Sequence, residues 1–168
     1  PVFIPPNVTR QPGPQPGLNP TTTTAMVSSL NQATAFCSVL PNAFAIDCLA
    51  DQLENISRQY AGLEGYGEAQ KAIADAAGQL RQIARDNRSS TQNRARFRTE
   101  EPNGPSTSRP LTAVDDAKLD SAVAQALTVI ANTETLLLRS SDTSVERVAQ
   151  FQQIADAVGS NKVLLRSL

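Results

Sequence analysis

The chain has 168 residues and a formal net charge of −1, with 40% hydrophobic residues, 4% aromatic residues, and neither tryptophan nor histidine. A near-neutral chain has no overall attraction to nucleic acid, so such binding needs a local basic patch. The absence of histidine removes the commonest general base and metal ligand, and excludes a Cys–His catalytic pair. The core must consist mainly of Ala, Leu, Val and Ile, which favours closely packed helices over aromatic-rich strands.

The first 24 residues are rich in proline and threonine, with seven prolines among them. Proline fixes φ and lacks an amide donor, so both helix and sheet are disfavoured. We predict an extended or disordered arm over residues 1–24, with Thr22 to Thr24 as N-cap candidates for the helix that follows. A proline-rich recognition motif is the alternative. Residues 25–168 are predicted to form one helical bundle domain.

Apolar residues at helical spacing predict the helices of this bundle. The first runs from Met26 to Leu40 and ends there because the residue before Pro41 is disfavoured in the α region. The second, from about 42 to 61, repeats apolar residues every 3.5 positions, which is typical of a helix packed lengthwise on another. Its Asp47 lies near the helix N-terminus, where a carboxylate is favourable. Further helices are predicted at about 68–86, 113–137 and 145–158.

Between the third and fourth helices lies a long polar loop, at about residues 87–112, which ends in turn-forming residues. Its first half is compatible with frayed helix. Loops of this length in compact domains are usually functional or disordered. The predicted fold is therefore all-α: an antiparallel helical bundle of four to five helices, with a long loop and a Pro-rich N-terminal arm.

The two cysteines, Cys37 and Cys48, flank Pro41. On one continuous helix they would lie about 16 Å apart along the axis, whereas a disulfide needs Cα atoms within about 7 Å. A chain reversal at Pro41 allows them to meet, so we predict a disulfide. Buried free thiols are the second interpretation, and redox chemistry is the third because neither a CxxC motif nor histidine is present. A disulfide predicts an extracytoplasmic location, periplasmic or secreted.

Motifs that carry chemistry are scarce. The chain has no Cys/His cluster for zinc and no glycine-rich phosphate loop, so we expect no catalytic residue, metal or cofactor. No apolar run approaches the roughly 18 residues of a spanning helix, so we expect no membrane span. The first hypothesis is a non-enzymatic helical interaction or scaffold module for an unknown protein partner. Its predicted contact residues are the apolar residues around the Pro41 corner: Phe36, Val39, Leu40 and Phe44.

Six arginines give the alternative function, which is binding of an anion or a nucleic acid. They lie on the third predicted helix and in the loop: Arg81, Arg85, Arg88, Arg94, Arg96 and Arg98. Arginines with an interleaved aromatic residue, here Phe97, can bind phosphates and stacked bases. Glu100 and Glu101 dilute the charge. A solvated helix face that runs into a loop is the simpler interpretation, so nucleic acid is not the expected partner.

The glycine-rich turn at residues 62–67 gives a third hypothesis. Glu64 lies in this turn and Glu68 follows it, and Tyr60 and Tyr66 are close in sequence, so these groups are candidates for binding or acting on a polar ligand. However, glycines after a helix usually terminate it, and acids at a turn are usually solvated. An enzyme that uses carboxylates and tyrosine therefore ranks behind both binding hypotheses.

Overall fold

The computed structural model describes residues 18–140 and 144–168. Residues 1–17, which hold most of the predicted Pro-rich arm, lie outside the described residues. The described chain is helical and contains no strand, which confirms the predicted all-α bundle. Its elements are α1 (Pro20–Ser38), η1 (Asn42–Phe44), α2 (Ala45–Gln59), α3 (Gly67–Asp86), η2 (Asp116–Lys118), α4 (Leu119–Arg139), α5 (Val145–Gly159) and α6 (Asn161–Arg166), where η denotes a short 3₁₀-helix.

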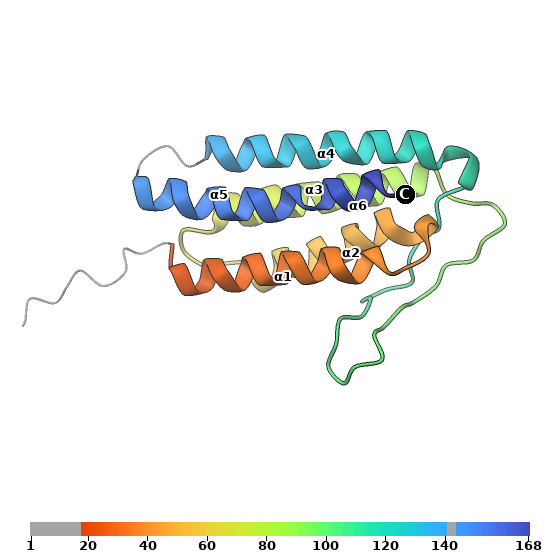
Figure 1. Cartoon of the computed structure of the whole chain (residues 1–168), viewed down its shortest axis with the longest axis horizontal. Coiled ribbons are helices and arrows are strands. Elements are labelled where there is room, and N and C mark those ends of the chain that lie inside the picture. The colour runs from red at the N-terminus through yellow and green to blue at the C-terminus, as the bar shows by residue number, and fades with distance from the viewer. Residues whose placement is uncertain (1–17, 141–143) are drawn as a thin grey trace, which may run out of the picture.

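The five long helices pack in a closed cycle around one apolar core (Figure 1). Each contacts two neighbours: α1 packs on α2 and α5, α3 packs on α2 and α4, and α4 packs on α5. The short α6 extends the line of α5 beyond Ser160 and also contacts α4. The core consists of small and medium side chains such as Ala, Leu and Ile, as the composition predicts, because these residues let helices approach closely.

Helix α1 begins earlier than the predicted start at Met26. Its N-cap is Asn19, whose side-chain oxygen accepts a hydrogen bond of 2.8 Å from the backbone N–H of Thr21. Pro20 occupies the first turn, where its missing N–H has no intrahelical partner to lose. Thr22 to Thr24, which the sequence indicates as caps in an extended arm, are therefore helical residues. The predicted end of the Pro-rich N-terminal arm, at residue 24, therefore lies inside α1.

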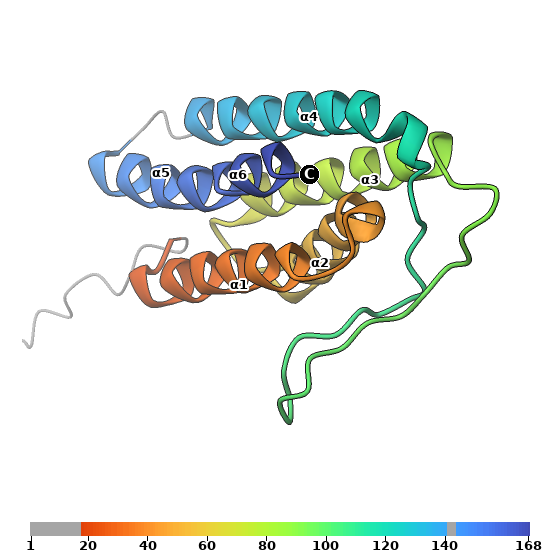
Figure 2. The ribbon, with the colours of Figure 1, turned by 45° about the vertical axis from the view of Figure 1, so that its right-hand side comes forward.

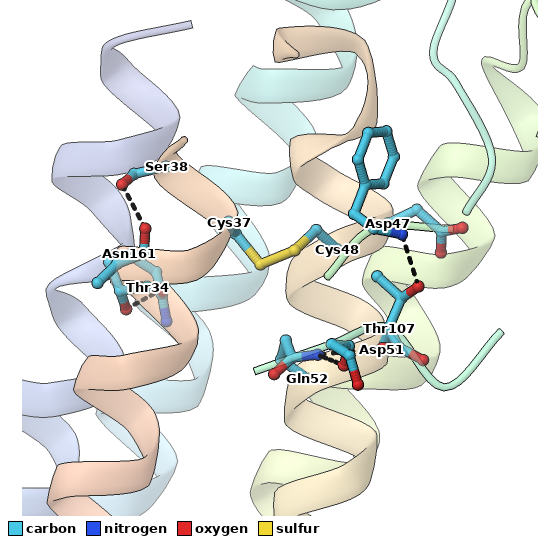
Figure 3. Close-up of a disulfide and its surroundings, with 12 residues drawn as sticks. Thr34, Cys37, Ser38, Asp47, Cys48, Asp51, Gln52, Thr107 and Asn161 are labelled. Carbon is cyan, nitrogen blue, oxygen red and sulfur yellow. Dashed lines mark hydrogen bonds between the residues drawn. A yellow bond between two sulfur atoms is a disulfide. The ribbon is translucent and has the colours of Figure 1, made fainter. Parts of the chain in front are cut away.

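The chain reverses at Pro41, as predicted. Helix α1 ends at Ser38, and α2 begins at Ala45 after one turn of 3₁₀-helix. Across this corner Cys37 and Cys48 form a disulfide with their Cα atoms 5.6 Å apart, which confirms the predicted pairing (Figure 3). Both cysteines are fully buried. A buried disulfide is consistent with an oxidising, extracytoplasmic location.

The connection between α3 and η2 leaves the bundle and returns to it as a narrow arm (Figure 2). Three isolated antiparallel bridges join its outgoing and returning halves: Arg88 with Val114, Ala95 with Leu111, and Arg98 with Ser106. We call residues 88–114 the arm and residues 98–105 the arm tip. No part of the arm is helical, so the predicted frayed helix in the first half of the loop is wrong.

One helical stretch of the described chain, residues 116–139, is long and apolar enough to cross a membrane by length and composition. Its most apolar window has a mean hydropathy of 1.2, and 33% of that window is buried in the bundle. Core helices of soluble proteins meet the same two criteria. The expectation that the chain has no membrane span therefore stays a prediction.

Candidate functional site

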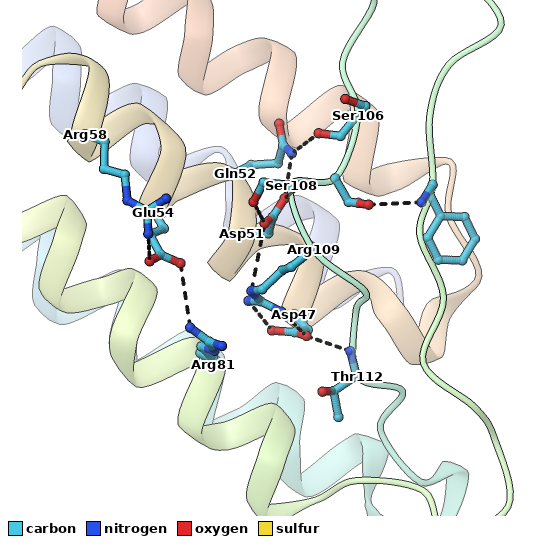
Figure 4. A network of polar contacts seen from close by, with 12 residues as sticks. Asp47, Asp51, Gln52, Glu54, Arg58, Arg81, Ser106, Ser108, Arg109 and Thr112 are labelled. Carbon is cyan, nitrogen blue, oxygen red and sulfur yellow. Dashed lines mark hydrogen bonds and ion pairs between the residues drawn. The ribbon is translucent and has the colours of Figure 1, made fainter.

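Two buried aspartates of α2 hold the arm against the bundle. Asp47 and Asp51 lie one helical turn apart and are 1% and 0% exposed. The guanidinium of Arg109, on the returning half of the arm, donates hydrogen bonds of 2.7 and 2.8 Å to the two carboxylate oxygens of Asp47 (Figure 4). Its Nε lies 3.9 Å from Asp51. This two-pronged geometry is the strongest form of an Arg–carboxylate pair.

Further donors from the arm complete the shell of both carboxylates. Asp47 accepts a hydrogen bond of 2.6 Å from the backbone N–H of Thr112. Asp51 accepts one of 3.0 Å from the backbone N–H of Ser108 and another from the Ser108 hydroxyl. Gln52 donates to the carbonyl oxygen of Ser106 at 3.0 Å. Because buried carboxylates are costly unless they are paired and hydrogen-bonded, these contacts fix the arm on α2.

The environment keeps Arg109 charged. Its hydrogen bonds to Asp47 raise the pKa of Arg109 above the ordinary value for arginine, and the nearby charges of Asp47, Asp51 and Glu54 raise the pKa further. Burial acts in the opposite direction but is outweighed. The arm is thus held by a group that does not lose its proton in any physiological compartment.

An apolar contact supports the same arm. Phe97 packs edge-on against Phe44, with ring centroids 5.0 Å apart, and Leu111 is fully buried. The backbone N–H of Val114 donates to the carbonyl oxygen of Ala43 at 2.8 Å. Phe44, which the sequence indicates as a partner contact, is therefore 3% exposed and covered by the arm. Phe44 therefore packs against the arm and has almost no exposed surface.

The arm tip lies beside the C-terminal half of α1, and an open groove of about 810 Å³ separates them. Three of the four predicted partner-contact residues line this groove: Phe36, Val39 and Leu40. Phe36 is buried and forms part of the floor, whereas Val39 is 76% exposed. The other wall consists of the arm tip. The groove is the candidate functional site, because it places an exposed apolar residue between two anchored walls.

The arm tip has a defined turn. Asn103 has a positive φ of 62°, and the N–H of Gly104 donates to the carbonyl oxygen of Glu101 at 3.1 Å. The N–H of Thr99 donates to the carbonyl oxygen of Pro105 at 3.0 Å. A Cβ atom at Gly104 would lie 1.9 Å from Oγ1 of Thr99, so only glycine fits this turn without a shift. The conformation of the arm tip, which forms one wall of the groove, therefore depends on Asn103, Gly104 and Thr99.

The six arginines of the predicted anion site fall into two groups. Arg81 lies on α3 beside α2, with a guanidinium nitrogen 3.9 Å from Glu54, and Arg85 and Arg88 are exposed near the end of α3. Three others project from the outgoing half of the arm: Arg94, Arg96 and Arg98. These three are exposed and alternate with Ala95 and Phe97, which pack on the core. Of the six, only Arg94, Arg96 and Arg98 share one face of one extended segment.

The tyrosines of the third hypothesis have structural positions. The Tyr66 hydroxyl lies 2.7 Å from the hydroxyl of Thr23 and donates to the carbonyl oxygen of Asn19 at 2.8 Å. Tyr60 and Tyr66 are both buried, with ring centroids 6.4 Å apart. Glu68, by contrast, is on the surface and pairs with Arg147 at 2.9 Å. The hydrogen bonds of the Tyr66 hydroxyl thus connect the start of α1 to the start of α3.

Sequence reasoning missed the residues that build the site, above all Asp51 and Arg109. The available signal was the spacing of two acids four residues apart inside a helix with a strong apolar repeat. An acid at such a position needs a buried donor. The missing partner is an arginine of the loop, and nothing local to α2 indicates which one.

Comparisons of the chain with protein-family models, with curated proteins and with solved structures find no significant match.

Proposed function

We propose that the protein is a non-enzymatic interaction module that binds a segment of a partner protein in the groove between α1 and the arm tip. The observation that carries this proposal is the exposure of Val39 between two braced walls. The Cys37–Cys48 bond braces the end of α1, and the Arg109–Asp47 pair braces the arm. A preformed groove favours binding because little conformational entropy is lost when it is filled.

The lining of the groove indicates the chemistry of the partner. Val39 and Leu40 offer apolar surface, and Pro102 and Pro105 line the opposite wall. Glu100 and Glu101 are exposed on this wall, and neither forms an ion pair with a described residue. We therefore expect a segment with one or two large apolar side chains next to lysine or arginine.

A photo-crosslinking residue at position 39 tests this proposal directly. Val163 on α6 is a matched control, since it is 72% exposed and does not line the groove. With extract from the native compartment, crosslinking from position 39 should give an adduct of discrete mass that the control lacks. The adduct should decrease when Glu100 and Glu101 are replaced with lysine. Equal labelling from both positions would refute the proposal.

The proposed compartment is extracytoplasmic, either periplasmic or secreted, because the cytosol keeps most thiols reduced. Mass spectrometry of the protein isolated from its native source under non-reducing conditions, after thiol blocking, tests this point. The expected result is a chain with no blocked cysteine. Two blocked cysteines would contradict both the compartment and the bracing of α1.

Binding of a polyanion through the arm is the second candidate. It is supported by the alternation of Arg94, Arg96 and Arg98 with inward-facing residues, since alternate residues of an extended segment lie about 7 Å apart on one side. Arginines in such a row can contact successive phosphates.

Heparin chromatography distinguishes this candidate from the first. A triple variant with glutamine at positions 94, 96 and 98 should elute at lower salt than the parent chain. The matched control replaces three exposed basic residues elsewhere with glutamine and has the same net charge: Arg58, Lys71 and Arg166. If both variants elute together, or the parent chain is not retained, the arm is not a polyanion site.

A further inference from the structure

Helix α4 presents an uncharged outward face along its whole length. On the side opposite its buried residues, six exposed positions follow one another in steps of three and four: Ser121, Ala124, Thr128, Ala131, Thr135 and Leu138. We call these residues the α4 outer face. A 3.5-residue repeat is typical of a helix that packs lengthwise on another helix. The most apolar window of this region has a mean hydropathy of 1.2, and only 33% of that window is buried.

Both threonine hydroxyls of the α4 outer face already donate hydrogen bonds within α4. The Thr128 hydroxyl donates to the carbonyl oxygen of Ala124 at 3.2 Å, and the Thr135 hydroxyl donates to that of Ala131 at 3.1 Å. Oγ of Ser121 accepts from Gln125 at 3.3 Å. Another helix can therefore cover this face without leaving the hydroxyl donor of either threonine unpaired. An unpaired buried donor is the usual cost of burying a polar helix surface.

The α4 outer face is symmetric about its own midpoint. Positions 121 and 138, 124 and 135, and 128 and 131 are equally far from the point between Val129 and Ile130. When two copies of the helix pair in antiparallel orientation about a two-fold axis, each of these positions faces its counterpart. The same arrangement places Asp120 of each copy opposite Arg139 of the other copy, so the contact contains two such pairs. Both residues are exposed, and neither forms an ion pair with a described residue.

We propose that two copies of this chain associate through an antiparallel contact between their α4 outer faces. Small side chains allow close approach of the two helices, and the Asp120–Arg139 pairs select the antiparallel orientation. A lipid surface fits less well, because membrane-surface helices present large apolar side chains with lysine or arginine at the border. A contact along α4 is about 31 Å long. One helix pair buries less than the roughly 800 Å² per partner of a standard interface, so the dimer is weak.

Sedimentation equilibrium of the full chain, at concentrations from about 5 to 500 µM, tests the proposal. Reversing the charge in Asp120→Arg or Arg139→Asp places like charges opposite each other and should weaken the dimer about tenfold or more. The double variant D120R/R139D restores opposite charges and should return the dissociation constant to within about threefold of the parent chain. D75R is the control, since Asp75 is an exposed aspartate of α3 and lies outside the face.

The double reversal gives the decisive result, because only an antiparallel pair recovers when both charges are exchanged. A chain that stays monomeric over the whole concentration range overturns the proposal. So does a dimer that tolerates D120R, or one that the double variant does not rescue. Circular dichroism confirms the fold of each variant. Flotation with phosphatidylcholine–phosphatidylglycerol vesicles checks the lipid alternative, and flotation that Ala131→Glu abolishes would also overturn the proposal.

Discussion

Arg109 and Asp47 are 62 residues apart in sequence and meet through two hydrogen bonds, at 2.7 and 2.8 Å, where the returning half of the arm crosses α2. The pair closes a polar network whose acceptors are buried on the helix and whose donors come mainly from the arm (Figure 4). A connection that is polar in composition is thereby attached to the core. The position of the groove wall depends on this attachment.

Replacing Arg109 with alanine should loosen the arm and destabilise the fold. Among the described residues, the change leaves the buried Asp47 side chain with the Thr112 N–H as its one donor. Breaking a buried pair costs about 3 to 5 kcal/mol, and we expect the lower value because the Arg109 side chain is 18% exposed. Urea denaturation measures the loss. Hydrogen exchange should accelerate at residues 106–114 before it does in α4.

The matched control for this variant is Arg58→Ala. Arg58 pairs with Glu54 at 2.5 Å on the surface of α2, where its side chain is 68% exposed. Surface pairs contribute about 0 to 1 kcal/mol, so the midpoint of unfolding should hardly change. If R109A and R58A lowered the free energy of unfolding equally, the arm would not be held by the buried pair.

The contribution of Arg109 should not change in mild alkali. Its pKa is raised in the folded chain by hydrogen bonds to Asp47, so the stabilisation is fully present below the unfolded pKa and is lost only as pH rises through the folded value. Both values lie far above neutrality. The difference in unfolding free energy between the parent chain and R109A should therefore be the same at pH 7 and pH 10. A difference that shrinks by half over this range would contradict the assignment.

Local spacing was sufficient to predict the helices, the reversal at Pro41 and the disulfide. Each of these features depends on residues within a few turns of one another, such as Cys37 and Cys48. Spacing places the start of the first helix at Met26, because proline and threonine have low helix propensity, whereas α1 begins at Pro20. Asn19 caps the helix, and Thr23 is buried against Tyr66, a residue 43 positions away. Tertiary contact thus overrides the low helix propensity of these residues.

The arm could not be predicted from spacing. The residues that form its bridges and its contacts with α2 are far apart in sequence, and no repeating pattern relates them. The polar composition of the arm also resembles that of an unstructured loop. Of the four predicted contact residues at the Pro41 corner, Phe36 and Phe44 are buried and Val39 is exposed. Which of them is exposed depends on the arm, because Phe97 covers Phe44 and leaves Val39 open.

Removing the disulfide should destabilise the chain without changing its helical content. For the loop closed by Cys37 and Cys48, with a sequence separation of 11, loss of the bond costs about 2 to 3 kcal/mol through the unfolded state. The variant C37A/C48A should therefore unfold at lower urea concentration, with a far-ultraviolet circular dichroism spectrum like that of the parent. An unchanged midpoint, with the bond verified in the parent chain by mass spectrometry, would contradict this prediction.

Tyr66→Phe should destabilise the junction between α1 and α3. The variant removes the acceptor of the Asn19 backbone N–H at 3.0 Å, and with it the contacts of the Tyr66 hydroxyl with the Asn19 carbonyl oxygen and the Thr23 hydroxyl at 2.8 and 2.7 Å. Loss of such contacts costs about 1 to 3 kcal/mol. Tyr60→Phe is the control, because no hydrogen bond joins the Tyr60 hydroxyl to a described residue, and it should be nearly neutral. Equal effects of the two variants on the urea midpoint would exclude this role for the Tyr66 hydroxyl.

Gly104→Ala should disturb the arm tip and with it the wall of the groove. The new Cβ would lie 1.9 Å from Oγ1 of Thr99 and 3.2 Å from the carbonyl oxygen of Glu101, so the turn must shift. Overpacking of this kind costs about 1 to 3 kcal/mol, and removing the opposing hydroxyl in G104A/T99A should recover part of it. The loss is measured by urea denaturation, and crosslinking from position 39 should decrease in the single variant.

Gly78→Ala is the control for the same substitution. A Cβ at Gly78 meets no atom within 4 Å, and the residue lies within α3, where alanine is favoured over glycine by about 1 kcal/mol. This variant should therefore raise the free energy of unfolding while G104A lowers it. If the same glycine-to-alanine substitution stabilises the chain at position 78 and destabilises it at position 104, the arm tip has a packed and specific conformation. This would hold although the arm tip lies outside the helical bundle. If G104A were neutral, the groove would lack the rigid wall on which the proposed binding depends.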